Sequence, residues 1–256
     1  MTAGDAPVLA LEEIHSYYDR SHVIQGVSLH VQPGEIVGLV GRNGAGKSTV
    51  LKTIMGVVRA RRGRVLVEGR DISQLATHEI ARAGLTLVPE DRRIFPALTV
   101  AENLRVSQLA MGAARAGRAS GSAGRGGGEP PAATLDEVFE YFPRLRERLQ
   151  HTGQHLSGGE QQMLALGRGL LARPRIMLVD ELTGGLMPIL VDSLMSILKR
   201  INERGMTVLL VEQDLGVVLD LAHRCYVLDQ GRIQFHGTAE ELRDNRVIQQ
   251  RYLGVS

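Results

Sequence analysis

The sequence predicts an α/β domain with a largely parallel central sheet. Short apolar runs of strand length alternate with helical patterns, as in folds where crossover helices connect parallel strands. The length of 256 residues, with 43% hydrophobic and 23% charged residues, fits one large domain or two coupled subdomains around a substantial core. A glycine-rich stretch at residues 41–49 joins an apolar strand directly to a helix start, which favours the same fold class.

The expected elements follow from the apolar patterns and the turn residues between them. Residues 27–31 alternate like a half-buried strand, and Pro33 with Gly34 marks a turn before a buried strand at residues 35–40. Further strands are expected at residues 8–11, 63–69, 86–89, 175–180, 207–211, 225–228 and 232–235, and helices at residues 50–55, 100–109, 135–149 and 163–166. This order predicts one domain over residues 1–256, with an N-terminal β subdomain and a helical subdomain at about residues 100–172.

Residues 110–133 differ in composition from the rest of the chain. They are rich in Gly, Ala, Arg and Ser and contain almost no large apolar side chain. Such a stretch cannot bury enough apolar surface to order itself, so a mobile insertion is predicted. Its arginines could contact anionic lipid or RNA, but a tolerated surface insertion is the simpler interpretation.

Composition excludes several classes of protein. The formal net charge of +2 gives no reason to expect a nucleic-acid partner. The single cysteine, Cys225, rules out an internal disulfide and a cysteine-based zinc site, and its apolar setting predicts a buried, inert thiol. Residues 1–8 lack the pattern of a secretory signal, and the sequence has no apolar run of the roughly 18 residues that a membrane span needs.

The glycine-rich stretch fits the phosphate-binding pattern G-x-x-x-x-G-K-[ST]. Its glycines let backbone N–H groups converge on a phosphate, and the following helix N-terminus favours an anion. A lysine at this position would contact the β- and γ-phosphates of a nucleotide, and the next hydroxyl would bind Mg²⁺. The candidate nucleotide-binding residues are Gly41, Arg42, Asn43, Gly44, Ala45, Gly46, Lys47, Ser48 and Thr49, with Ser48 also a metal ligand.

Acidic residues follow two of the predicted strands. Asp180 and Glu181 end an apolar strand, where a carboxylate of a phosphate-loop protein meets Mg²⁺. We expect Asp180 to hold the metal through water and Glu181 to polarise the attacking water. Glu90 lies just past the strand at residues 86–89, where it could reach a metal-bound water beside the γ-phosphate, and a solvated charged turn is the alternative.

Two further stretches are candidates for nucleotide contact. Ser157 is predicted to cap a helix with Glu160 as its capping-box partner, while Gly158 and Gly159 would leave N–H groups open to a phosphate. An aromatic residue at position 17 or 18, some twenty residues ahead of the phosphate loop, could stack on a base or pack in the core, and the residues alone leave both open.

These motifs, in this order, resemble the ATP-binding subunits of ABC transporters over nearly the whole chain. The signature stretch at residues 156–162 is the specific part of this resemblance, because phosphate loops occur in many nucleoside triphosphatases. The resemblance implies ATP and Mg²⁺ as cofactors and a head-to-tail pair of ATPase domains. Each ATP would lie between the phosphate loop of one chain and Ser157, Gly158 and Gly159 of the other. Tyr18 falls where the family carries its adenine-stacking aromatic residue.

Finer features are similar to the second ATPase subunit of branched-chain amino-acid importers. The stretch at residues 88–100 is typical of that group, with Glu90 where most ABC ATPases carry glutamine. Gln213 stands where most carry the switch histidine, which makes it a catalytic candidate beside Glu181. Urea and short-chain amide importers are similar, and a soluble ABC ATPase or a weakly active scaffold within a heterodimer are rival interpretations.

Several positions depart from the family pattern. Leu182 replaces a proline, Met187 replaces an aspartate or alanine, and Asp91 replaces a glycine. Gly167 and Gly169 stand in the predicted helix where alanine is usual, and each would cost that helix up to about 1 kcal/mol. The implied partners are transmembrane permease subunits, a second ATPase subunit, identical or different, and indirectly a periplasmic binding protein. The implied location is the cytoplasmic face of a bacterial inner membrane.

Overall fold

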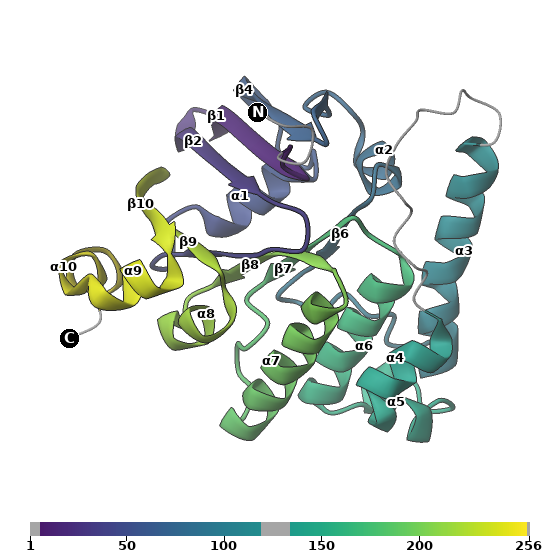
Figure 1. Cartoon of the computed structure of the whole chain (residues 1–256). Helices are drawn as coiled ribbons and strands as arrows, with labels where there is room; N and C mark the ends of the chain where they lie inside the picture. The colour runs from purple at the N-terminus through teal and green to yellow at the C-terminus, as the bar shows by residue number, and fades with distance from the viewer. Residues whose placement is uncertain (1–5, 119–133, 255–256) are drawn as a thin grey trace.

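The computed structural model describes residues 6–118 and 134–254, with side chains outside residues 110–118. Its centre is a six-stranded sheet in the order β10-β9-β3-β8-β7-β6 (Figure 1). The bounds are β3 Ile36–Val40, β6 Leu85–Val88, β7 Ile176–Asp180, β8 Thr207–Glu212, β9 Arg224–Asp229 and β10 Arg232–Thr238. All pairs are parallel except β10 with β9, which confirms the predicted, largely parallel sheet.

A second sheet confirms the expected N-terminal β structure. It has four strands in the order β2-β1-β4-β5, all antiparallel. The strands are β1 Leu9–Tyr18, β2 Ser21–Val31, β4 Ala60–Val67 and β5 Arg70–Asp71. β1 is longer than predicted and ends in the Tyr17-Tyr18 pair, so both tyrosines belong to a hairpin rather than to a loop.

Helices cover both faces of the central sheet. The bounds are α1 Lys47–Ile54, α2 Thr77–Arg82, α3 Val100–Arg118, α4 Leu135–Tyr141, α5 Pro143–Glu147, α6 Gly158–Leu171, α7 Pro188–Glu203, α8 Leu215–Leu221, α9 Ala239–Asp244 and α10 Arg246–Ile248. In a strand that is covered on both faces, successive side chains point alternately into two different apolar cores. In β3, Val37 and Leu39 pack with α1 and the second sheet, and Ile36 and Val40 pack with α6 to α8.

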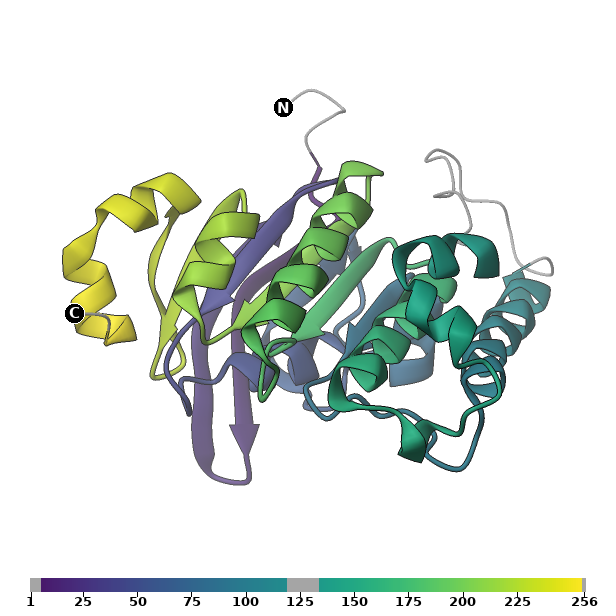
Figure 2. The same ribbon diagram turned by 90° about the horizontal axis from the view of Figure 1, so that it is seen from below.

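The helical part gathers α3, α4, α5 and α6 at one end of the sheet (Figure 2). The helix predicted at residues 135–149 is two helices, because Pro143 begins a new one after Phe142. α3 continues to Arg118, so the residues 110–118 that we expected to start the insertion are helical. The rest of that predicted insertion, residues 119–133, lies outside the described residues.

The parallel strands bring the functional candidates to one edge. In parallel register Val40 lies beside Glu212, and Asp180 lies beside Val211. The carboxyl ends of β3, β7 and β8 therefore meet, and ligands of open α/β sheets bind at such an edge. No helix in the described part of the chain has the length and hydropathy of a membrane span.

Candidate functional site

The loop between β3 and α1 has the shape that a bound phosphate requires. Gly44 and Gly46 have φ of +81° and +109°, which L side chains rarely adopt. A Cβ on Gly41 would lie 2.2 Å from the Leu228 carbonyl oxygen. α1 begins at Lys47 with no side-chain cap within the described chain, so its first N–H groups remain free for an anion.

Lys47 connects this loop to the end of β7. Its Nζ donates to the Gly41 carbonyl over 2.8 Å and lies 3.2 Å from Oε1 of Glu181. The two side chains are 4% and 19% exposed, so this ion pair is well shielded from water. The structure thus brings together two predicted residues that are far apart in the chain.

The predicted metal ligands also meet. Ser48 Oγ donates to Asp180 Oδ1 over 3.3 Å. Burial raises the pKa of Asp180, and the charges of Glu181 and Glu90 add to that effect against the Ser48 hydrogen bond and Lys47. Glu90 shares a pocket of about 220 Å³ with Ser48 and Asp180. A hydroxyl and carboxylates are the hard oxygen ligands that Mg²⁺ prefers, so the donor set fits this ion.

Glu181 and Gln213 face a second pocket at the same edge. Its volume is about 370 Å³, and it is lined by Glu181, Thr183, Gly184, Glu212, Gln213 and Asp214. Glu181 has a φ of +42°, an uncommon conformation outside glycine, and its N–H donates to the Val211 carbonyl over 2.9 Å. Both predicted catalytic residues therefore lie at one opening.

The signature stretch begins α6 as predicted. Ser157 Oγ accepts from the N–H of Glu160 over 3.3 Å, and the Ser157 N–H donates to Glu160 Oε2 over 2.8 Å. Glu160 also pairs with Arg148 at 3.4 Å, so this carboxylate is held by the protein itself. Ser157 is exposed at the helix start and Gly158 is half-buried, whereas Gly159 is buried, where a Cβ would lie 2.8 Å from Leu190 Cδ1.

Tyr18 ends β1 with 42% of its surface exposed. The neighbouring Tyr17 instead stacks on His22 with ring centroids 4.2 Å apart, and the Arg61 guanidinium lies 4.4 Å from its centroid. Tyr17 is thus engaged within the sheet, while Tyr18 keeps an exposed ring. Stacking of Tyr18 on a base stays a prediction, and its exposed ring leaves room for that contact.

Two side chains that the sequence analysis did not select connect the site residues. Glu212 is 1% exposed and accepts from both the N–H and the Oγ1 of Thr183, each over 3.1 Å. Arg92 donates from Nε to Gln162 and from Nη1 to Gln161, each over 3.1 Å. Glu212 had a sequence signal, since it is an acid that ends an otherwise apolar strand. Arg92 had none, because its partners lie about seventy residues away.

The structure gives packing reasons for two of the family departures. A Cβ on Gly167 would lie 3.0 Å from Val138, and one on Gly169 would lie 3.0 Å from Val88. The two glycines therefore let α6 approach α4 and β6 closely. Leu182 is 1% exposed in the core, whereas Met187 is 64% exposed as the residue that precedes α7. Cys225 is fully buried, which confirms the predicted burial, and this burial raises the pKa of its thiol to about 12.

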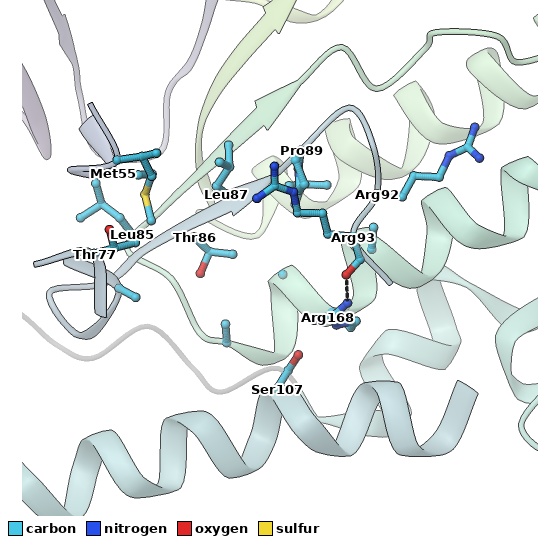
Figure 3. A pocket seen from close by; sticks show the side chains of 16 residues that line it. Met55, Thr77, Leu85, Thr86, Leu87, Pro89, Arg92, Arg93, Ser107 and Arg168 are labelled. Atoms are coloured by element: carbon cyan, nitrogen blue, oxygen red, sulfur yellow. Dashed lines mark hydrogen bonds between the residues drawn. The ribbon is translucent and has the colours of Figure 1, made fainter. Parts of the chain in front are cut away.

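A groove of about 390 Å³ lies beside the site, between β6 and the helices α2, α3 and α6 (Figure 3). Apolar side chains such as Met55, Leu85 and Leu87 line it together with Arg93 and Arg168. Arg168 donates to the Arg93 carbonyl over 2.6 Å and lies over the Phe95 ring. Its buried Nε has no hydrogen-bond partner among the described residues, and burial lowers the pKa of its guanidinium.

A family model and the sequences of known proteins point to the same family. A family model described as ABC transporter matches residues 24–184. The chain is 40% identical to the high-affinity branched-chain amino acid transport ATP-binding protein BraG of Pseudomonas aeruginosa, over 96% of this chain and 100% of BraG. It is 33% identical to the lipopolysaccharide export system ATP-binding protein LptB of Escherichia coli, over 96% of this chain and 97% of LptB.

Solved structures agree with the sequence relatives. A nucleotide-free ATP-binding cassette from an ABC transporter superposes with a TM-score of 0.78 at 25% identity, covering 98% of this chain and 99% of that one. A cassette in its ADP conformation gives 0.76 at 26% identity, covering 95% and 97%. From these matches and the convergence of phosphate loop, Asp180 and signature helix, the chain belongs to the ABC transporter family of ATP-binding cassettes.

Proposed function

We propose that this chain binds and hydrolyses ATP and thereby energises the uptake of amino acids, with branched-chain amino acids as the substrate class. The observation that carries the catalytic part is the convergence of Lys47, Ser48, Asp180, Glu181 and Gln213 at one edge of the sheet. The substrate class rests on the 40% identity to BraG over its full length.

Each residue has a role that its position supports. The loop N–H groups and Lys47 bind phosphates, and Tyr18 stacks on the adenine. Ser48 and Asp180, with Glu90, hold Mg²⁺, which when bound neutralises phosphate charge. Glu181 acts as general base toward water, and Glu90 and Gln213 contact the γ-phosphate. Because Gln213 cannot take a proton as histidine can, its contact is a neutral hydrogen bond.

The Lys47–Glu181 ion pair suggests how the site responds to its substrate. The ammonium group is held by a loop carbonyl and by the candidate base. Phosphate oxygens compete for the same ammonium, because a charge-assisted bond to phosphate is at least as strong as one to a carboxylate. ATP would thus release Glu181 from Lys47 and leave its carboxylate free to accept a proton from water.

A second copy or a sister subunit completes the site in this proposal. The exposed Ser157 and the N–H groups of Gly158 and Gly159 at the start of α6 contact the ATP of the partner chain. In return, the partner's signature stretch contacts the ATP on the phosphate loop of this chain. The transmembrane permease subunits bind the groove between α2, α3 and α6 (Figure 3). Its apolar lining suits the apolar face of a permease helix, and the partly buried Arg168, whose Nε has no partner among the described residues, favours a carboxylate on that helix.

The test is purification of the chain with its membrane partners from solubilised bacterial membranes. We expect two permease subunits, an ATPase partner or second copy, and a periplasmic binding protein whose bound ligand is a branched-chain amino acid. ATP turnover by the complex should rise when that binding protein is loaded. A soluble chain that brings down no membrane protein would contradict the transport role, and a different ligand would contradict the substrate class.

A second candidate, lipopolysaccharide export, is favoured by one observation. The chain is 33% identical to LptB of Escherichia coli over 96% of its length, against 40% to BraG over the same share. The same purification separates the two functions. An exporter complex would contain membrane subunits without a periplasmic binding protein for a small solute.

A further inference from the structure

A buried carboxylate outside the proposed catalytic set holds the loop that carries Glu181. We propose that Glu212 is a positioning residue for Glu181, acting through Thr183, and that its two hydrogen bonds replace the restraint that a proline at position 182 would supply. The inference rests on the proposed ATP hydrolysis by Glu181 and assigns a role that the motifs do not contain.

Glu212 lies at the centre of the functional edge. It is the last residue of β8, which runs between β3 and β7, and it stands beside Val40 at the end of the phosphate-loop strand. Its side chain is 1% exposed, and Glu212 and Asp180 are the buried acids of the described chain. A carboxylate in such a place is retained only with strong hydrogen bonds, because burial without partners is costly.

One residue of the catalytic loop donates two hydrogen bonds to this carboxylate. Thr183 donates its N–H to Oε1 and its Oγ1–H to Oε2, each over 3.1 Å. Thr183 is two residues past Glu181, whose own N–H donates to the Val211 carbonyl. The stretch from Glu181 to Thr183 is therefore tied to the end of β8 at three points.

This attachment fixes the backbone of a loop that is otherwise held by Leu182 and Leu186 packed against the core. Glu181 has a positive φ of +42°, which persists only where the surroundings enforce it. Leu182 leaves that backbone freer than proline would, since proline fixes its own φ and restricts the residue before it. Gly184 and Gly185 follow and are exposed, and among the described residues the bonds of Thr183 to Glu212 are the last hydrogen bonds from this loop to a buried side chain before the chain reaches α7.

Glu212 also links the two halves of the opening where hydrolysis is proposed. The pocket of about 370 Å³ is lined by Glu181 and Thr183 from the loop after β7 and by Glu212, Gln213 and Asp214 from the end of β8 and the residues after it. Burial raises the pKa of Glu212, and hydrogen bonds from Thr183 and from the Gln213 backbone oppose that effect. The same side chain therefore contacts the base loop and the backbone of the γ-phosphate sensor.

The experiment compares ATP turnover of four single variants of the full chain in its transporter complex. We expect Glu212→Ala and Thr183→Val to lower kcat at least about tenfold, with KM for ATP changed less than about twofold, because misplacement of a reacting group affects the chemical step. Glu212→Gln and Thr183→Ser keep the paired hydrogen bonds, so they should stay within about threefold of the parent kcat. The double variant Glu212→Ala/Thr183→Val should be no worse than Glu212→Ala alone, because the hydroxyl bond that Thr183→Val removes is one of the two bonds that Glu212→Ala removes.

A control and an epistasis test separate positioning from folding. Glu35 is a mostly buried acid, 11% exposed, at the opposite edge of the same sheet, where it pairs with Arg224 at 2.6 Å. Glu35→Ala should lower the unfolding temperature without lowering kcat. In a Glu181→Gln background, Glu212→Ala should change the residual rate by less than about twofold, since it acts only through Glu181.

The role of Glu212 is overturned if Glu212→Ala and Thr183→Val keep the parent kcat, or if Glu212→Ala lowers the rate equally in the Glu181→Gln background. It is also overturned if Glu35→Ala reproduces the kcat loss. Should Glu212→Ala fail to fold, Thr183→Val decides alone, because valine matches threonine in shape. A parent complex without ATP turnover would overturn the proposed function together with this role, whereas an active parent with unaffected variants overturns only the role.

Discussion

The phosphate-loop edge and the signature end of α6 differ in how much of their chemistry one chain completes. At the edge, Lys47, Ser48, Asp180 and Glu181 contact one another and lie at least partly shielded from water. At the start of α6, the hydrogen bonds of Ser157 go to its own capping partner, Glu160, and the two glycines carry no side chain that could reach further. The contacts of the phosphate-loop edge are therefore formed within one chain. The exposed Ser157 at the start of α6 is accessible to a molecule outside this chain.

From this difference we expect some substitutions to affect the site of a single chain, and others to affect only the activity that requires two chains. A change at the sheet edge should affect the site in a single copy. A change at the helix start should leave nucleotide binding by a single copy intact and affect only turnover that needs two copies. Four predictions test this division, from the largest expected effect to the smallest.

Glu181→Gln should produce the largest effect. Loss of a general base lowers turnover by about 10²–10⁴-fold, while ATP binding should persist because the phosphate loop is untouched. Turnover and nucleotide affinity of the purified variant check this, with Glu203→Gln, an exposed glutamate at the end of α7, as the control. Hydrolysis at the parent rate would show that Glu181 is not the base.

Gly158→Asp should lower turnover by about tenfold or more while leaving the fold intact. An acid in the first turn stabilises a helix but repels a phosphate that approaches that end. Gly158→Ala is the matched neutral control. Mixing the Gly158→Asp chain with a Lys47→Ala chain should restore part of the turnover if the chain pairs with itself, because each mixed pair contains one site with an intact loop and an intact helix start. Loss of ATP binding by the isolated Gly158→Asp chain would contradict the division between the two regions.

Arg92→Ala should disturb the connection between the two regions. It removes both donors to the α6 amides and leaves the buried Gln162 oxygen without its partner, which costs about 1–3 kcal/mol of unfolding free energy. Turnover should fall less than in Gly158→Asp, and Arg92→Lys should not rescue it, because lysine lacks the forked donor pair. Chemical unfolding and ATP turnover are the measurements. If Arg92→Ala changed neither the free energy of unfolding nor the turnover, the contact of Arg92 with Gln161 and Gln162 would not couple the two regions.

Gly169→Ala should give the smallest effect and one on stability alone. The added methyl improves helix propensity by up to about 1 kcal/mol but meets Val88 at 3.0 Å, where overpacking costs about 1–3 kcal/mol. We expect a net loss of about 1 kcal/mol in the free energy of unfolding, with turnover per folded molecule unchanged. A higher unfolding temperature would show that α6 and β6 adjust to the added methyl group at little cost, and that Gly169 is not needed for their packing.

Local patterns in the sequence were sufficient for most elements and for the nucleotide motifs. The strand, loop and helix around Lys47 are contiguous, and the Ser157–Glu160 capping box spans three residues, so both follow from local chemistry. The predicted end of α3 was wrong because composition argued for a loop at residues 110–118, where the helix continues. The proline at position 143 explains why one predicted helix became two.

The sequence by itself determined which residues could bind phosphate and metal, because those motifs need only short-range geometry. Only the tertiary structure decided that Lys47 meets Glu181, that Arg92 reaches α6 and that Glu212 holds Thr183. These contacts depend on the order and register of parallel strands joined by long crossovers. Strand order and register are set by how both faces of the sheet are buried, and no local pattern around any one of these residues contains that information.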